Sequence, residues 1–148
     1  MATAKATRLE LAYLAGIFDG EGSIVIGRVN RRDRPNPSHV LFCRVAMCTP
    51  YIPGLFMFRF QGNIRTFKPS NPNWNRQWAW SISGCKAVDF LKTIRPYLRL
   101  KKSEADLAII FQEGIGVQYH TIPKDVLAVR EAQKILMSSL KDKSQGVK

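Results

Sequence analysis

Blocks of apolar residues along the chain predict a succession of helices and strands. The first block is helical. Thr7 and Glu10 form a capping-box start, and every residue from Leu11 to Phe18 is apolar or glycine. We expect a helix over Thr7–Gly22, ended by its glycines. Because this helix is apolar all round, one side should pack on the protein's own sheet and the other side needs a partner.

The later blocks predict two pairs of strands, each pair followed by a helix, and then two further helices. The strands are expected at Ser23–Val29, Val40–Met47, Asn63–Phe67 and Gln77–Ser83, and the helices at Pro53–Phe60, Lys86–Arg95, Ser103–Glu113 and Pro123–Leu140. This order predicts an α+β fold, αββαββα, in which an antiparallel four-stranded sheet carries helices on one face and leaves the other face open. We expect one domain over residues 1–148, with a core at about 7–113 and a C-terminal helical extension at about 117–141.

Alternation within the strands divides their side chains between the two faces of the sheet. The core side should hold Ile24, Ile26, Leu41, Cys43, Val45, Met47, Ile64, Trp78, Trp80 and Ile82. The open side should hold Arg31, Arg44, Asn63, Arg65, Asn75, Gln77 and Ser81. Arginine and amide side chains read base edges in a major groove, although each one singly also suits an ordinary solvated strand face.

Charge strengthens the nucleic-acid interpretation. The chain of 148 residues has a net charge of +12, and residues 23–86 hold ten Lys and Arg against Asp33 alone. The connections between paired strands are basic and rich in Pro and Asn, so Arg32, Arg34, Lys68 and Arg76 are expected to contact phosphates. An almost purely cationic segment is typical of a polyanion-binding protein, whereas a surface tuned for solubility mixes both signs.

Other classes of protein are disfavoured. The three cysteines lack C-x-x-C spacing and the chain has only His39 and His120, which disfavours a disulfide scaffold, a zinc ribbon and a His-rich metal site. No apolar run is long enough to span a bilayer, and Met1–Arg8 lacks the apolar region of a signal peptide. We therefore expect the protein to be located in the cytoplasm or nucleoid or in an organelle matrix. We expect it to be neither secreted nor inserted in a membrane.

The segment Leu14-Ala-Gly-Ile-Phe-Asp-Gly-Glu-Gly22 resembles the signature of the LAGLIDADG homing endonucleases. It lies on the first predicted helix with a strand directly after it, as in that family. The segments Trp80–Leu91 and Pro96–Ala105 also resemble the family's second half, so the resemblance covers about residues 8–113. It implies sequence-specific cleavage of double-stranded DNA at a long, partly palindromic site, and a gene within a mobile intron.

The small residues of this helix suggest how two copies would meet. Ala12, Gly16 and Gly20 are spaced by four residues, so they share one helix face and permit close approach of a second helix. The chain contains the motif once, so the second helix must come from a second chain, which predicts a two-fold symmetric homodimer. A buried helix without a partner is the alternative.

The resemblance also implies an active site. Glu21 matches the family's metal-binding acid, the backbone carbonyl of Gly20 would help to bind Mg²⁺ (or another divalent cation), and Asp19 is expected to be structural. Lys101 matches a basic residue near the scissile phosphate, with Lys102 as its neighbouring rival. Thr49 is the best match for a polar residue that positions water, but two nearby prolines disturb the comparison.

Two rival functions stay open at this stage. One is a binding protein that keeps the fold without cleavage, either an RNA maturase or a regulator. The other is a structural or ribosomal RNA-binding protein, which would suit the charge but leaves the Leu14–Gly22 helix unexplained. Retention of an acid at Glu21 and of Lys101 favours the nuclease.

Overall fold

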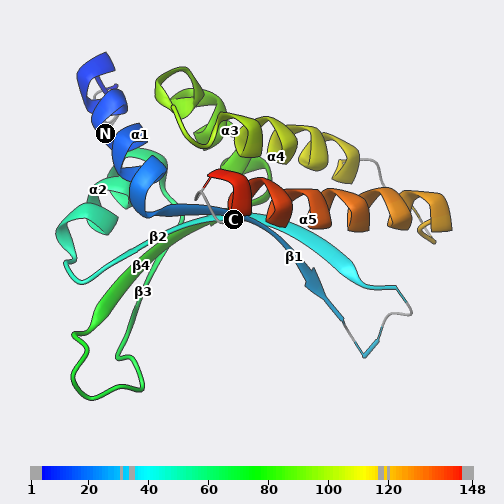
Figure 1. The fold of residues 1–148 in the computed structure, drawn as a ribbon, viewed down its shortest axis with the longest axis horizontal. Helices are drawn as coiled ribbons and strands as arrows, with labels where there is room; N and C mark the ends of the chain where they lie inside the picture. Colours follow the sequence, from blue (N-terminus) through cyan, green and yellow to red (C-terminus); the bar gives the residue numbers. More distant parts are fainter. Residues whose placement is uncertain (1–4, 31, 34–35, 117–118, 120, 145–148) are drawn as a thin grey trace.

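A curved antiparallel sheet and a layer of helices on one of its faces make up the protein (Figure 1). The structure is a computed structural model that describes residues 5–30, 32–33, 36–116, 119 and 121–144. The elements, in chain order, are α1 (Arg8–Glu21), β1 (Gly22–Val29), β2 (Ser38–Met47), α2 (Tyr51–Phe60), β3 (Asn63–Phe67), β4 (Gln77–Ser83), α3 (Gly84–Ile94), the 3₁₀ turn η1 (Arg95–Tyr97), α4 (Lys102–Ile115) and α5 (Lys124–Ser144). The predicted order of helices and strands is confirmed.

The four strands lie in the order β1-β2-β4-β3, with every neighbouring pair antiparallel. The two hairpins therefore meet through β2 and β4, and β1 and β3 form the edges. All helices lie on the convex side of the sheet, and its concave side is left uncovered (Figure 1). This is the arrangement that the alternating pattern predicts.

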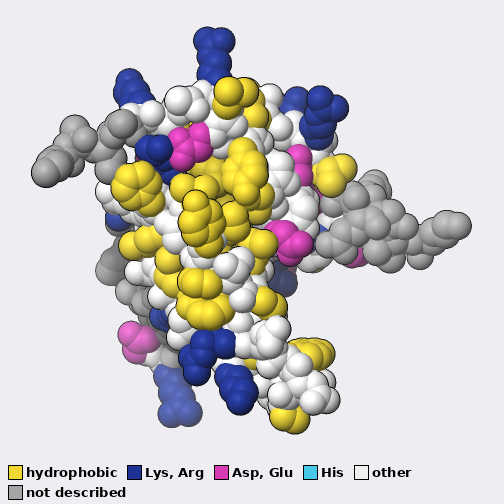
Figure 2. Space-filling model, turned by 90° about the vertical axis from the view of Figure 1, so that its left-hand side faces the viewer, with side chains coloured by type: hydrophobic (Ala, Val, Ile, Leu, Met, Phe, Trp, Pro, Cys, Tyr) yellow, Lys and Arg dark blue, Asp and Glu magenta, His cyan; other side chains and the backbone are white. Residues whose placement is uncertain are grey.

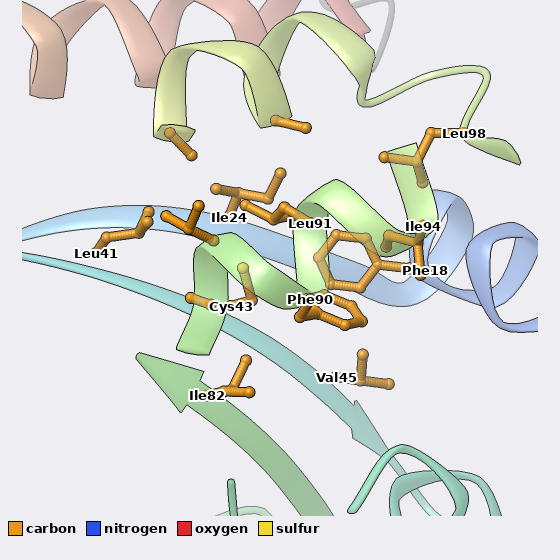
Figure 3. Close-up of a cluster of buried hydrophobic side chains, with 14 of the residues drawn as sticks. Phe18, Ile24, Leu41, Cys43, Val45, Ile82, Phe90, Leu91, Ile94 and Leu98 are labelled. Carbon is orange, nitrogen blue, oxygen red and sulfur yellow. The ribbon is translucent and has the colours of Figure 1, made fainter. Parts of the chain in front are cut away.

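The core lies between the sheet and the helices. Phe18 at the end of α1 meets Phe90 of α3 edge to face, with ring centroids 5.1 Å apart, above the buried side chains of β1, β2 and β4 (Figure 3). Trp80 is fully buried, stacks at 4.9 Å on Phe56 of α2, and donates its ring N–H to the carbonyl oxygen of Gln61. Burial of apolar area on this scale is the main driving force for folding.

The predicted core side of the sheet is correct, but three of its members are less buried than expected, and one of them is Met47, which is partly buried. Ile64 is 37% exposed and Trp78 is only partly buried. These residues lie toward one edge of the sheet, since β3 is an edge strand whose residues are all exposed, and Trp78 pairs with Thr66 of β3 and with Met47 of β2. Sequence alternation assigns a face to a residue but does not say how far the covering helices extend.

Two other expectations need correction. The helix predicted from Pro53 begins two residues earlier at Tyr51, so Pro53 lies in its first turn, where a missing N–H costs nothing. Asn75 was expected on the open face of the sheet, but it lies in the connection that precedes β4. It is exposed there and remains near the basic residues of that connection.

Candidate active site and nucleic-acid interface

The C-terminal end of α1 is tied to the segment that leads into α4. The carboxylate of Asp19 accepts hydrogen bonds from three successive backbone N–H groups, those of Arg99 (2.8 Å), Leu100 (3.2 Å) and Lys101 (3.1 Å). Such charge-assisted bonds are stronger than neutral ones, and they join residues about eighty positions apart in the sequence. Asp19 therefore does the structural work that the motif predicts for it.

Lys101 is turned inward at the same junction. Its side chain is almost fully buried, and its Nζ donates to the backbone carbonyl oxygen of Asp19 at 3.1 Å. This carbonyl belongs to the last turn of α1, where the helix dipole favours a cation. The adjacent Lys102 is exposed. Burial therefore distinguishes the two lysines. Lys101 is the one that contacts the Leu14–Gly22 segment, through the carbonyl of Asp19.

Glu21 is the last residue of α1, and its side chain is exposed. A carboxylate at the negative end of a helix dipole is unfavourable unless a cation lies near it. The donors available at this end are the carboxylate of Glu21 and backbone carbonyls such as that of Gly20, which are hard oxygen ligands of the kind that Mg²⁺ prefers. Among the described residues no group of three or more His, Cys, Asp or Glu could hold a metal ion. A metal here would take its remaining oxygens from water, phosphate or a second chain.

The last glycine of the motif has a separate packing role. A Cβ at Gly22 would lie 2.3 Å from Cδ2 of Phe18 and 2.6 Å from the carbonyl oxygen of Phe18. Only glycine lets the chain pass so close to this buried ring as it leaves the helix for β1.

Thr49 has a local structural contact. Its Oγ1 accepts the backbone N–H of Tyr51, the first residue of α2, at 3.3 Å. The N-cap residue of α2 is Pro50, and no side chain caps this helix by a hydrogen bond. The predicted role of Thr49 in positioning water stays a prediction.

One side of α1 is uncovered along its whole length. Ala12, Gly16 and Gly20 are exposed, and a Cβ at either glycine would meet nothing within 4 Å. Leu9 is 85% and Tyr13 is 55% exposed. A hollow of about 720 Å³ lies alongside, lined by Ala12, Gly16, Asp19, Pro96, Tyr97, Leu98, Arg99 and Lys102.

This uncovered side belongs to a wider apolar patch. Figure 2 shows the end of the molecule that carries α1 and α2, where hydrophobic side chains gather in one continuous area. From α2, Tyr51 and Phe58 are 77% and 57% exposed. Contiguous exposed apolar area of this kind marks an interaction surface. The structure thus leaves the small-residue face of α1 accessible to a partner, as the spacing predicts.

The concave side of the sheet carries five of the eleven predicted nucleic-acid contacts. Arg44 of β2, Ser81 of β4 and Asn63 of β3 lie in one row across the sheet, since Arg44 pairs with Ser81 and Ser81 with Asn63. Arg65 and Gln77 lie on the same side, further along. A hollow of about 400 Å³ opens there, lined by Phe42, Arg44, Asn63, Arg65, Thr66, Phe67, Ala79, Ser81, Ile82 and Ser83.

The remaining predicted contacts lie in the two connections. Arg32, Lys68 and Arg76 are exposed at the ends of the hairpins, as expected for phosphate contacts. Arg31 and Arg34 lie outside the described residues.

The C-terminal helix makes contacts that the sequence analysis did not anticipate. Glu131 of α5 accepts from Nε2 of the buried His39 on β2 at 2.9 Å and lies 3.8 Å from Nη1 of Arg28 on β1. The bond with His39, together with the nearby Arg28 charge, lowers the pKa of the Glu131 carboxyl below its usual range. Residues 92 positions apart give no local sequence signal for such a pair.

Lys141 of α5 lies close enough to Lys101 and Glu104 to interact with their charges. Burial lowers the pKa of Lys141 on α5, and the nearby buried Glu104 opposes this effect, while Lys101 adds to it. The buried charges around the first turn of α4 therefore include a contribution from the C-terminal helix.

No protein-family model matches the sequence, and no curated protein is detectably similar to it. Within the described residues no helix is long and apolar enough to cross a membrane.

Solved structures with a similar fold are homing endonucleases. The chain superimposes on I-CvuI in complex with its target with a TM-score of 0.74 at 22% identity, covering 89% of this chain and 82% of that chain. The archaeal intron-encoded I-Vdi141I complexed with DNA has a TM-score of 0.75 at 14% identity, covering 89% and 84%. The LAGLIDADG homing endonuclease I-GzeII in complex with its DNA target has a TM-score of 0.59 at 17% identity, and there the match spans 48% of the longer chain.

The chain therefore has the fold of the LAGLIDADG homing endonucleases. The helix that carries the Leu14–Gly22 segment is α1, and the open face of the sheet is the face that the resemblance assigns to DNA.

Proposed function

We propose that the protein is a sequence-specific endonuclease that cleaves double-stranded DNA as a homodimer in the presence of Mg²⁺. The observation that carries the proposal is the end of α1. There Asp19 and Lys101 fix the helix to α4, and Glu21 keeps an exposed carboxylate beside them. The neighbours I-CvuI and I-Vdi141I are complexes with DNA, and I-CvuI was crystallised with Mg and with Ca, which supports a divalent cation.

Two copies would join through the uncovered side of α1. With Gly16 and Gly20 facing one another across the dyad, the two helix ends and their two Glu21 carboxylates would come side by side. Each protomer would then supply one acid and one Lys101 to a site at the centre of the DNA. A gene within an intron is part of the proposal, as it is for the intron-encoded I-Vdi141I.

The chemistry follows from these positions. Glu21 would hold a divalent cation, which when bound supplies positive charge that polarises the scissile phosphate. Lys101 is buried and donates to the Asp19 carbonyl, so its ammonium would add a positive charge close to the helix end. The concave sheets would lie in the major groove and select the sequence.

The size of the site follows from the strands. β4 has seven residues, so at ~3.3 Å per residue it spans about 23 Å, or about seven base pairs at ~3.4 Å each. Two symmetric sheets with a central gap would cover about 18–22 base pairs. We expect a partly palindromic site whose sequence preference is weakest at its centre.

Selection of cleaved products from a random duplex library tests the proposal. Wild-type protein with Mg²⁺ should enrich one partly palindromic sequence, and Glu21→Gln with Mg²⁺ or wild type with a chelator should enrich none. Specific binding without any cleaved product would identify a non-cleaving regulator or maturase and refute the nuclease. A footprint shorter than about 12 base pairs, or one without two-fold symmetry, would refute the sheet-in-groove dimer.

A further inference from the structure

The concave side of the sheet contains an arginine whose position is set by an aromatic ring two strands away. Arg44 projects from β2, and Phe67 lies near the end of β3, with β4 between them. Two of the β4 residues on this side of the sheet are small, namely Ser81 opposite Arg44 and Ala79 next along, while the longer Gln77 lies opposite Phe67. Because Ser81 and Ala79 are small, they leave space in the 400 Å³ hollow for the Arg44 side chain to extend over β4.

Arg44 makes its observed contact across this floor. Its guanidinium carbon lies 5.5 Å from the centroid of the Phe67 ring, which is cation–π distance. Both side chains are exposed, with Phe67 at 37%. Among the described residues Arg44 has no hydrogen bond or ion pair. The ring therefore orients the arginine without using any of its N–H donors.

An oriented arginine has a specific use on a surface that reads DNA. Arginine makes two parallel hydrogen bonds to O6 and N7 of guanine, which is the commonest base-specific contact in a major groove. A long exposed side chain loses rotamer freedom when it makes such a contact, so prior ordering favours binding in the required geometry. Phe67 would order the Arg44 side chain through its ring, without taking part in the hydrogen bonds to the base.

We propose that Phe67 is a positioning residue that holds Arg44 for bidentate contact with a guanine in each half-site, so that preference for this guanine depends on the aromatic ring. The inference rests on the proposed function, because it assigns one base of the DNA target to one pair of side chains. It concerns specificity alone, so cleavage by the end of α1 does not depend on it.

The test is a binding selection from a random duplex library with the full-length chain and five variants. The variants are Arg44→Ala, Phe67→Leu, Phe67→Tyr, the double variant Arg44→Ala with Phe67→Leu, and the control Phe42→Leu. Leucine keeps apolar bulk at position 67 and removes the aromatic face, and tyrosine restores that face. Phe42 lies on the same side of the sheet and is half-buried. Its variant therefore shows the effect of removing an aromatic ring other than the one that Arg44 lies over.

The expected result is a guanine preference at one symmetric pair of positions that Arg44→Ala removes. Phe67→Leu should weaken the preference at those same positions by about two- to fivefold, the worth of an exposed cation–π contact. Phe67→Tyr should restore it, Phe42→Leu should leave it unchanged, and the double variant should match Arg44→Ala there.

Two results would overturn the inference while leaving the proposed function intact. One is specific binding in which Phe67→Leu keeps the full guanine preference at the positions set by Arg44. The other is a loss in Phe67→Leu that falls on different positions or is equal for all sequences, which would indicate a general structural role. Absence of specific DNA binding by the wild type would instead refute the proposed function, and the inference with it.

Discussion

At the scale of single residues, four neighbours at the end of α1 have four different roles. Asp19 binds the segment before α4, Gly20 leaves the outer helix face bare, Glu21 keeps an exposed carboxylate, and Gly22 makes room for Phe18. Because these roles depend on different contacts, substitutions at adjacent positions should have clearly separable effects on folding, assembly and chemistry.

Glu21→Gln should stop cleavage while leaving sequence-specific binding nearly unchanged. The amide keeps the size of the side chain but removes the negative charge that would hold the cation, so we expect the cleavage rate to fall by more than about a hundredfold. Glu113→Gln, at an exposed position on α4, is the matched control. Cleavage rates and dissociation constants on the selected site measure both effects, and cleavage by Glu21→Gln at the wild-type rate would show that the acid is misidentified.

Gly22→Ala should destabilise the fold itself. Its Cβ would lie 2.3 Å from the buried Phe18 ring, so ring and backbone must shift, at a cost of about 1–3 kcal/mol. Gly114→Ala is the control, because a Cβ on this α4 glycine meets nothing within 4 Å. Urea unfolding gives both free energies, and equal stability of Gly22→Ala and the wild type would contradict the packing described here.

At the scale of elements, the order and type of the helices and strands could be predicted because their patterns are local. Period-two alternation marked the strands, and the Thr7 cap and Gly22 marked the ends of α1, whereas α4 begins at Lys102 without a side-chain cap and continues through Gly114 to Ile115. The exposure of Ile64 and the bond between His39 and Glu131 could not be predicted, because each depends on which distant element covers a strand. The contact between Arg44 and Phe67 was not predicted either, because Arg44 was assigned to the open face and Phe67 only to a strand.

Gly16→Leu should prevent dimerisation without harming the protomer. The position is open in the single chain, so the new side chain clashes only with a second helix. Gly114→Leu adds the same side chain at an open position on α4 and should leave assembly unchanged. Sedimentation would show the difference, and a dimeric Gly16→Leu protein would exclude this face of α1 as the interface.

Glu131→Gln should make the attachment of α5 less sensitive to pH. The folded pKa of Glu131 is lowered, so its charge stabilises the fold above the usual carboxyl pKa, and this stabilisation is lost as the pH falls through the folded value. We expect the variant to melt below the wild type at about pH 7 and the gap to narrow at about pH 3.5. Melting curves at the two pH values measure the gap, and a constant gap would contradict the ion-pair contribution.

At the scale of the whole molecule, two exposed surfaces support the proposed function. The concave sheet carries arginine and amide side chains. The end with α1 and α2 carries exposed apolar ones (Figure 2). Strand alternation and charge predicted the open face of the sheet, and the apolar first helix predicted an uncovered side of α1, but the exposure of Tyr51 and Phe58 on α2 was not predicted. The burial of Lys101 could not be predicted from the sequence, because it follows from the contact of α1 with the start of α4.

A mixed dimer tests the central claim most directly, namely that two copies of this chain each bring one Glu21 to a shared DNA dyad. Wild-type and Glu21→Gln chains with different affinity tags are co-expressed, and the mixed dimer is purified through both tags and given the selected site with Mg²⁺. We predict that it binds as the wild type does and nicks one strand, while the wild-type dimer cuts both. Cutting of both strands by the mixed dimer at the wild-type rate, or failure to isolate any mixed dimer, would contradict the account.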